Sequence, residues 1–551
     1  MTAEGSERRG TRLRRAVRGA VAGCVAGGAA LAAAEPVAAL VRPQVAPLTV
    51  VGGAAIDRAP TPVKEWAIRT FGTDDKPMLQ LGIVAVLLLF ACALGVVAVR
   101  HRRAGSAGVL LIGLVGAAAA LTRPDAAGLL DALPSLVAAV VGALVLYWLS
   151  GLAARDRAAD VAVAAPTDEA APTPTDEAAP APTPAPRNPL ARRPFLLAVG
   201  GTALGSVAIG ALGRGLAGSR GSGARASREA LTLPAPASPA PPVPKGTQLR
   251  IPGVSPFRTP NSDFYRVDTA LVVPEVDAGT WRLRLHGKGV SRPVTFTLDD
   301  LLGRDLIERD ITLTCVSNEV GGPYAGNARW LGVPLATLLR EAGVRPPQKG
   351  GPADQLVARS VDGMTIGTPV DDVMDGRDAL LAVGMNGQPL PFAHGFPVRM
   401  VVPGLFGYVS ACKWLTDLEL TTFDAYDPYW VKRKWARRAP IKTQARIDTP
   451  KPFAHPRTGT VMVAGVAWAQ HRGIDKVEVR VDDGPWEAAE LAAEDSRDTW
   501  RQWSYTWRAT KGGHNLTVRA TDRTGDVQTA QRAGTFPDGA SGRHTVVVTV
   551  D

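Results

Sequence analysis

The sequence predicts three kinds of structure in one chain: transmembrane α-helices first, then a mixed α+β domain, then an all-β sandwich. Three observations predict this order. The long apolar runs all lie before residue 220, the prolines are concentrated between residues 166 and 260, and the remainder alternates short β-like runs with turns. A chain of 551 residues is long enough for roughly three or four such units.

Charge and cysteine content exclude several classes of protein. The formal net charge is +11, but the arginines lie in separate clusters that flank apolar stretches, as topology signals do, so we expect no nucleic-acid partner. Apolar residues make up 46% of the chain, which excludes a disordered protein. Four cysteines are too few for a disulfide-dense scaffold or a multi-cysteine metal cluster.

Five apolar stretches are predicted to cross a membrane as helices. A run of this kind spans about 30 Å of hydrocarbon when it is helical. A soluble protein could bury such helices instead, but it would not need uncharged runs of this length. The predicted spans are 19–41, 79–99, 106–122, 132–152 and 194–212.

Basic clusters set the expected topology. Arginines precede the first span between residues 8 and 15, follow the second at residues 100–103, and precede the fifth at 192–193. Because positive residues favour the cytoplasmic side, five crossings place all three clusters inside and everything after about residue 218 outside. We therefore expect a multi-pass protein of the cell membrane with its catalytic domain on the extracytoplasmic side. His101 is the only histidine before residue 286, so the spans are expected to anchor the protein or dock another subunit.

The expected domain boundaries follow from changes in composition. The membrane region covers residues 1–218 and includes a linker rich in Pro and Ala at 153–193, and a Pro-rich spacer follows at 219–249. The α+β domain is expected at 250–435 and the sandwich at 436–551. Arg192 and Arg193 before Phe195 resemble a twin-arginine export signal, but an ordinary pair of cytoplasmic arginines explains them equally well.

Cys315 is the first candidate for chemistry. It ends an alternating strand and enters a loop that contains Gly321 and Gly322. Thiolate is a ligand for soft metals and for high-valent metals with sulfur co-ligands. A buried free thiol, or a disulfide with Cys412, remains an alternative on this evidence alone.

A second segment, residues 386–414, collects polar and cationic side chains in a loop shaped by Gly and Pro. It contains His394, Arg399 and Lys413. A fixed guanidinium and an ammonium that converge on one place suit a phosphate or another anion.

Together these segments resemble the sulfite oxidase family of molybdopterin enzymes. Residues 386–414 contain NGQPLP, HGFPVR, VPG and CKW, which match the family's cofactor-binding segment, and TCVSN at 314–318 stands where its molybdenum-ligating cysteine falls. Residues 261–268 resemble its early pterin-contacting segment, and residues 360–365 the stretch after the first half. The resemblance covers about residues 250–540 and implies an α+β molybdopterin-binding domain of the sulfite oxidase type.

The resemblance also implies a cofactor, its contacts and an electron partner. Cys315 would give its thiolate to molybdenum, with Arg266 as a second catalytic residue, and the cofactor would be molybdenum-molybdopterin. No segment resembles the haem domain fused to vertebrate sulfite oxidases, so we expect a separate electron-transfer partner, either a cytochrome or a quinone-linked subunit. The family's pterin contacts fall on Phe264, Tyr265, Arg266, Asp268, Asp362, His394, Arg399, Ala411, Cys412 and Lys413.

One departure from the family concerns the substrate. Sulfite oxidases carry an arginine shortly after the metal cysteine, whereas this chain has Glu319, whose carboxylate would repel a sulfite dianion. Arg266 and Arg329 leave some positive charge for an anion. An uncharged sulfoxide or another oxo-acceptor therefore competes with sulfite as the expected substrate.

The C-terminal region predicts an Ig-like sandwich of regularly spaced short strands. By resemblance to the family, this domain would mediate homodimer formation, and Arg472 is a candidate to reach the active site. A hairpin turn is expected at 482–484. The predicted strands are 461–467, 477–481, 500–507, 516–520 and 544–550.

The predicted function is oxygen-atom transfer on a small or protein-bound substrate by a membrane-anchored molybdenum oxidoreductase. The contrasting hypothesis is a surface binding or adhesion protein with an Ig-like domain, whose molybdenum fold has lost its metal and its catalysis. Retention of Cys315, His394, Arg399 and Lys413 in one chain favours the enzyme.

Overall fold

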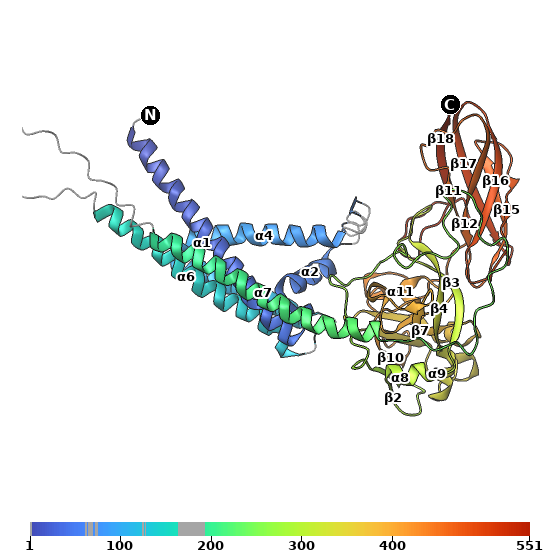
Figure 1. The fold of residues 1–551 in the computed structure, drawn as a ribbon, viewed down its shortest axis with the longest axis horizontal. Coiled ribbons are helices and arrows are strands. Elements are labelled where there is room, and N and C mark those ends of the chain that lie inside the picture. The colour runs from blue at the N-terminus through green and yellow to red at the C-terminus, as the bar shows by residue number, and fades with distance from the viewer. Residues whose placement is uncertain are drawn as a thin grey trace, which may run out of the picture. The chain divides into compact units, whose positions relative to one another are not determined.

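The chain divides into two compact units, Met1–Arg220 and Gly221–Asp551. The structure is a computed structural model (Figure 1), and it describes residues 3–60, 63, 70–71, 75–123, 126, 128–162 and 193–551. Most of the expected linker, residues 163–192, lies outside the described residues, as does Arg192 of the possible twin-arginine signal.

The first unit is built from helices. Among the residues that the structure describes, five helices are long and apolar enough to cross a membrane, in line with the five predicted spans: Leu13–Val41, Pro77–Ala98, Arg102–Leu121, Leu129–Ala154 and Pro194–Glu229. The α-helices are α1 (Ala3–Val41), α2 (Pro47–Arg58), α4 (Asp75–Ala98), α5 (Arg102–Leu121), α6 (Leu133–Ala162) and α7 (Arg193–Glu229), with 3₁₀ turns η1 (Pro43–Val45) and η3 (Leu129–Ala132). The short helix α2 was not predicted.

Small residues let α1 and α4 approach each other closely. A Cβ atom at Gly23 would lie 1.9 Å from the backbone oxygen of Ala91, and one at Gly95 would lie 2.0 Å from that of Gly19. Such small-residue contacts are typical of helix pairs in membranes. Large apolar side chains of α4 are exposed, Leu89 to 70%, and exposed apolar surface of this extent is not typical of a soluble monomer.

Two boundaries differ from the expectation. Helix α6 continues to Ala162, so the linker expected from residue 153 begins only after that residue, because the Ala- and Arg-rich stretch 153–162 favours helix. Helix α7 continues to Glu229, inside the spacer expected at 219–249, and ends shortly before the run of prolines that begins at residue 234. The spacer then packs on a sheet, where Ser238 pairs with Ile307.

Two sheets form the framework of the α+β part. The first has the strand order β2-β1-β10-β5-β6, in which only β1 and β10 pair in parallel. The second has the order β3-β4-β7-β8, with β9 beside β7. The strands are β1 (Leu283–Gly287), β2 (Val294–Phe296), β3 (Ile307–Thr314), β4 (Ala325–Pro334), β5 (Gln355–Ser360), β6 (Thr365–Pro369), β7 (Leu380–Met385), β8 (Gln388–Pro389), β9 (Arg399–Val401) and β10 (Leu415–Thr421).

Short helices connect these strands. Thr297 and Asp300 form a reciprocal capping box that starts α8 (Leu298–Leu302) where the sequence predicts a helix. The helix expected from residue 333 begins only after β4 ends at Pro334. The other helices are α9 (Leu335–Glu341), α10 (Val370–Met374) and α11 (Gly407–Ser410), with 3₁₀ turns η5 (Pro347–Lys349), η6 (Phe392–His394) and η7 (Val431–Arg433).

The C-terminal part consists of two four-stranded antiparallel sheets, drawn in orange and red in Figure 1. Their orders are β11-β12-β16-β15 and β14-β13-β17-β18, and apolar side chains of both sheets form one hydrophobic cluster. All five predicted strands are present, whereas β11 and the short β14 and β15 were not predicted. The strands are β11 (Gln444–Thr449), β12 (Gly459–Trp468), β13 (Ile474–Val481), β14 (Glu487–Ala488), β15 (Glu490–Leu491), β16 (Arg501–Ala509), β17 (Gly512–Asp522) and β18 (His544–Val550).

Candidate cofactor-binding site

Cys315 follows the last residue of β3 and is buried. Its backbone N–H donates to the carbonyl of Tyr324 (2.9 Å), and the N–H of Ser317 lies 3.4 Å from its Sγ. The thiol is free, and so is that of Cys412, so no disulfide joins these two residues. The strand end therefore presents one unmodified sulfur.

The surroundings of Cys315 shift the pKa of its thiol in opposite directions. Burial raises the pKa of the thiol, while the N–H of Ser317 and the positive charge of Lys413 lower it. Without a further cation the thiol stays protonated at neutral pH. A coordinated metal ion deprotonates such a thiol, so this position suits a metal ligand better than a free nucleophile.

Arg399 on β9 is a buried cation without an acidic partner. The guanidinium lies over the ring of Trp330, 4.9 Å from its centre, and Nη1 donates to the carbonyl of His394 at 3.2 Å. Its Nε is buried and has no hydrogen-bond partner, and among the described residues it forms no ion pair. Burial lowers the pKa of Arg399 to about 10. Burying a charge without a counter-ion costs free energy, and a bound anion would offset that cost.

Lys413, Asp268 and Arg266 form a second polar group. The Nζ of Lys413 contacts Asp268 Oδ2 at 2.5 Å, and the Nε of Arg266 contacts the same oxygen at 2.9 Å. Burial lowers the pKa of Lys413 to about 8, and Asp268 opposes that shift. Arg266 is therefore already paired, whereas the sequence suggested that its charge was available for a substrate.

Gly395 brings the two cationic side chains together. Its φ is +107°, and a Cβ atom there would lie 3.0 Å from the Cβ of Lys413 and 3.1 Å from that of Arg399. Only glycine adopts this backbone without strain, and only glycine leaves both neighbours in place.

Gly395→Ala is expected to cost about 1–2 kcal/mol of stability through backbone strain and to lower the molybdenum content by separating Arg399 and Lys413. Gly350→Ala is the matched control, because Gly350 also has positive φ (+76°) but has no atoms near its Cβ position. Melting temperature and metal analysis of both variants test this. Equal molybdenum content in the two would contradict the steric account.

His394 holds a neighbouring segment in place. Its Nε2 lies 3.1 Å from the carbonyl of Asn261, and because a carbonyl only accepts, Nε2 carries the proton. Burial and the charge of Arg399 lower the pKa of His394 to about 4, so the ring is neutral at pH 7. The ring of Phe264 stands edge-on to it, and Phe264 stacks on Tyr265. His394 was expected to contact the cofactor, but its Nε2–H already donates a hydrogen bond to the carbonyl of Asn261.

Three further predicted contacts lie on neighbouring loops. The Oδ1 of Asp362 accepts from the N–H of Met364 at 3.3 Å, and Ala411 ends α11 by donating to Gly407. Burial and the charge of Asp362 raise the pKa of Cys412, which stays a thiol.

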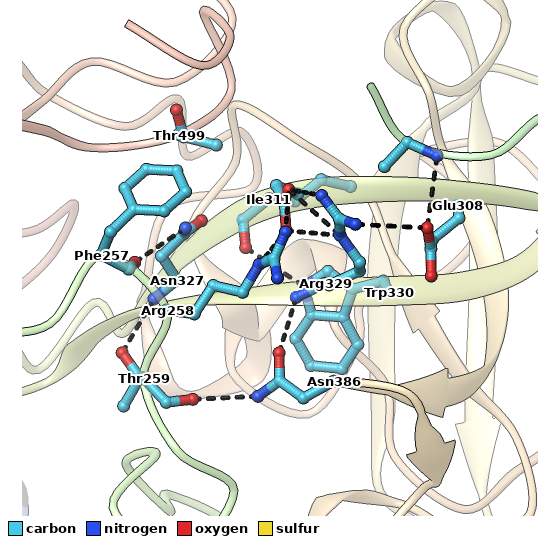
Figure 2. Close-up of polar contacts among 12 residues, drawn as sticks. Phe257, Arg258, Thr259, Glu308, Ile311, Asn327, Arg329, Trp330, Asn386 and Thr499 are labelled. Carbon is cyan, nitrogen blue, oxygen red and sulfur yellow. Dashed lines mark hydrogen bonds and ion pairs between the residues drawn. The ribbon is translucent and has the colours of Figure 1, made fainter. Parts of the chain in front are cut away.

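Arg329 and Arg472, the arginines considered for the active site from the sequence, form ion pairs with other residues. Figure 2 shows Arg329 of β4 with its guanidinium toward Glu308 of β3, which it contacts at 3.6 Å. Arg329 also contacts Asp310 of the same strand at 2.5 Å. Arg472 pairs with Asp522 at 2.8 Å within the C-terminal sheets. Each of these two arginines pairs with a buried aspartate, so neither offers its charge at Cys315.

A cavity of about 340 Å³ lies beside Asp310 and does not include any predicted cofactor contact. Its lining includes Asp378, Asp495 and Asp498, and burial with the charge of Asp310 raises the pKa of Asp495 to about 6. An acid-lined cavity does not fit an anionic cofactor, so we place the site at Cys315.

Comparison with known proteins gives a match for this part of the chain. Residues 270–430 match the family model described as oxidoreductase molybdopterin binding domain. The chain is 30% identical to the mitochondrial sulfite oxidase of Rattus norvegicus over 316 residues, 49% of this chain and 57% of that protein. It is 30% identical to the human enzyme over 304 residues, 47% of this chain and 55% of that protein.

Two further similarities complete the comparison. The sulfite oxidase of Gallus gallus is 30% identical over 319 residues, 49% of this chain and 68% of that protein. The crystal structure of the sulfane dehydrogenase SoxCD from Paracoccus pantotrophus aligns with a TM-score of 0.46 and 24% identity, over 53% of this chain and 83% of that chain. The chain thus spans little more than half the length of the mammalian relatives.

The matched domain defines a molybdopterin-binding protein, whose cofactor is molybdenum-molybdopterin. The chain belongs to the sulfite oxidase family. The residues present fit this cofactor, since the unpartnered Nε of Arg399 and the ammonium of Lys413 are suitable donors for its phosphate, and a thiol stands near them.

Proposed function

We propose that this protein is a membrane-anchored molybdenum oxidoreductase that transfers an oxygen atom to or from a sulfur-containing substrate outside the cytoplasmic membrane. The observation that carries the proposal is the buried thiol of Cys315 in the electrostatic range of Lys413. Gly395 brings Lys413 together with the buried Arg399, which forms no ion pair among the described residues. When bound, the cofactor supplies two-electron redox chemistry coupled to oxygen-atom transfer.

Each part of the site has a separate task in this proposal. Cys315 ligates molybdenum, and Arg399 and Lys413 bind the cofactor's phosphate. His394 positions residues 261–268 through Asn261 instead of donating to the cofactor. The remaining contacts with the pterin are assigned to Phe264, Tyr265, Arg266, Asp268, Asp362, Ala411 and Cys412.

Tyr265 is a candidate donor within the reaction space. Burial and the proximity of Cys315 raise the pKa of its phenol, so the hydroxyl is protonated at neutral pH. The hydroxyl would lie 3.9 Å from a Cβ atom at Gly407, and the carbonyl of Thr314 would lie 3.8 Å from the same atom. A neutral phenol there can donate a hydrogen bond to a substrate oxygen without adding charge.

Charge pairing favours an uncharged sulfoxide over sulfite as the substrate class. Arg266 pairs with Asp268, which Lys413 shares, and Arg329 pairs with Asp310 and Glu308. Glu319, in the loop after Cys315, is exposed and adds no positive charge. A sulfite dianion needs unpaired cations, whereas a sulfoxide needs one hydrogen-bond donor at its oxygen.

Steady-state assays with artificial dyes test this. We expect methionine sulfoxide reduction with a reduced dye to give the larger kcat/KM, and sulfite oxidation with an oxidised dye to give the smaller. The reverse ratio would reject the substrate class. Protein from a molybdate-fed host that lacks both activities and lacks molybdenum would favour the alternative, a metal-free surface binding or adhesion protein with an Ig-like domain.

The finer features of the assembly are part of the same proposal. Five apolar helices and their basic flanks support a multi-pass protein whose residues after about 218 face the extracytoplasmic side. Two antiparallel sheets with a common core support an Ig-like sandwich, through which a homodimer would form. A separate cytochrome or quinone-linked subunit would exchange electrons with the site.

A further inference from the structure

The C-terminal sheets hold the strand that leads into Cys315. Gln470, just after β12, is buried, and its Nε2 donates to the carbonyl of Thr312 (3.0 Å) and contacts the hydroxyl of Thr314 at 3.2 Å. The N–H of Trp500 donates to the hydroxyl of Thr312 at 2.8 Å. The last residues of β3 are thus bonded on one edge to β4 and on the other to the C-terminal part of the chain.

The same part of the chain also holds the loop that leaves Cys315. Arg446 of β11 is 8% exposed, and its Nη1 donates to the carbonyl of Gly322 at 2.8 Å. Its orientation is set by Asp448, which accepts from Nε at 2.7 Å, and by the hydroxyl of Ser255, which accepts from Nη2 at 2.9 Å. A buried arginine held by hydrogen bonds from three of its nitrogens has little rotational freedom.

His544 fills the space beside the loop. A Cβ atom at Gly321 would lie 2.2 Å from the ring, so the chain comes close to it only because residue 321 is glycine, with φ of +81°. The Nδ1 of His544 accepts from the N–H of Ile447 at 3.0 Å. Burial and the charge of Arg446 lower the pKa of His544 to about 4, so the ring keeps this acceptor at neutral pH.

The loop also has hydrogen bonds of its own close to the sulfur. The carbonyl of Tyr324 accepts from Cys315, and the side-chain oxygen of Asn318 accepts from the N–H of Tyr324 at 2.7 Å. The bonds from Gln470 and Arg446 add fixed points on both sides of these contacts. Outer partners of this kind orient a metal ligand and tune the metal.

We propose that Arg446 and Gln470 are positioning residues for the Cys315 thiolate, so that the C-terminal sheets form part of the catalytic centre and do more than mediate association. The inference rests on the proposed function in one respect, that Cys315 binds molybdenum. The two residues act through the backbone of β3 and of the loop, and neither touches the sulfur.

Three variants and one control test the inference in the full-length, molybdenum-loaded protein. Gln470→Met removes both bonds to β3 without adding charge, Arg446→Gln removes the bond to Gly322, and Arg446→Lys is the conservative rescue. Arg472→Gln is the matched control, since Arg472 also makes a 2.8 Å ion pair with a buried aspartate of the same sheets but does not contact the Cys315 loop.

The readouts are kcat and KM separately and the electron paramagnetic resonance spectrum of the reduced, molybdenum-loaded protein. For Gln470→Met and Arg446→Gln we expect kcat to fall about 10- to 100-fold with KM changed less than about threefold, and the spectrum to shift. Arg446→Lys should recover part of kcat. Arg472→Gln should change the melting temperature and leave the spectrum unaltered.

Unchanged spectra and kcat in both Gln470→Met and Arg446→Gln would overturn the inference, as would the same spectral shift in Arg472→Gln. Gln470→Met keeps the test decisive if Arg446→Gln does not fold. Failure of the proposed function would look different, because the wild-type protein itself would then contain no molybdenum and give no signal.

Discussion

Cys315→Ser is expected to lose more than about a hundredfold in kcat while keeping its fold. The loss of kcat should exceed the loss expected for a residue that only positions a metal ligand, because this substitution removes the proposed ligand itself. A serine hydroxyl has nearly the same shape as the thiol but is a poor ligand for a metal that prefers sulfur. Circular dichroism, melting temperature and a steady-state assay of the purified variant provide the measurement.

Cys412→Ser is the matched control for this prediction. Cys412 is the other buried free thiol of the second unit, so its replacement carries the general cost of changing a buried cysteine. We expect it to retain molybdenum, with kcat within about tenfold of the wild type. Full activity in Cys315→Ser, or equal losses in the two variants, would remove the ligand assignment.

Arg399→Met is expected to abolish retention of the cofactor and, at the same time, to stabilise the cofactor-free protein. The guanidinium is buried, and its Nε has no partner, so the empty site bears the cost of an uncompensated charge. An apolar side chain of similar length removes that cost, which we expect to raise the melting temperature of the cofactor-free form by about 2–4 °C. Molybdenum content and thermal unfolding of both forms measure the two effects.

Arg377→Met provides the contrast. The side chain of Arg377 is also mostly covered, with 9% exposed, but it pairs with Asp372 and Asp375 at 2.8 and 2.7 Å. Its replacement leaves carboxylates without their cation and should lower stability by about 1–2 kcal/mol in both forms without loss of molybdenum. A molybdenum content in Arg399→Met equal to that of the wild type would contradict the role given to Arg399.

The elements that sequence patterns predict well are those that depend on local sequence. The alternation along 544–550 gives β18 with the predicted bounds. Cys315 at a strand end, and the cations of 386–414, are also readable from short segments. These features need only residues that are close in sequence.

The pairing of charges could not be read in the same way. Arg329 lies opposite Asp310 because of the register in which β3 and β4 pair. That register could not be read from the sequences of the two strands. Arg472 was expected near the site, yet this loop residue pairs with Asp522, which lies fifty positions away at the end of β17. The contact of Arg446 with Gly322 joins residues 124 positions apart. The tertiary structure therefore decides which cations remain for a ligand.

Metal and cofactor analysis of the purified wild-type protein from a molybdate-fed host tests the central claim most directly. The account predicts about one molybdenum and one molybdopterin per chain, both lost in Cys315→Ser or Arg399→Met. Wild-type protein that folds, with Cys315 accessible to a thiol reagent after unfolding, yet holds neither molybdenum nor molybdopterin, would contradict it.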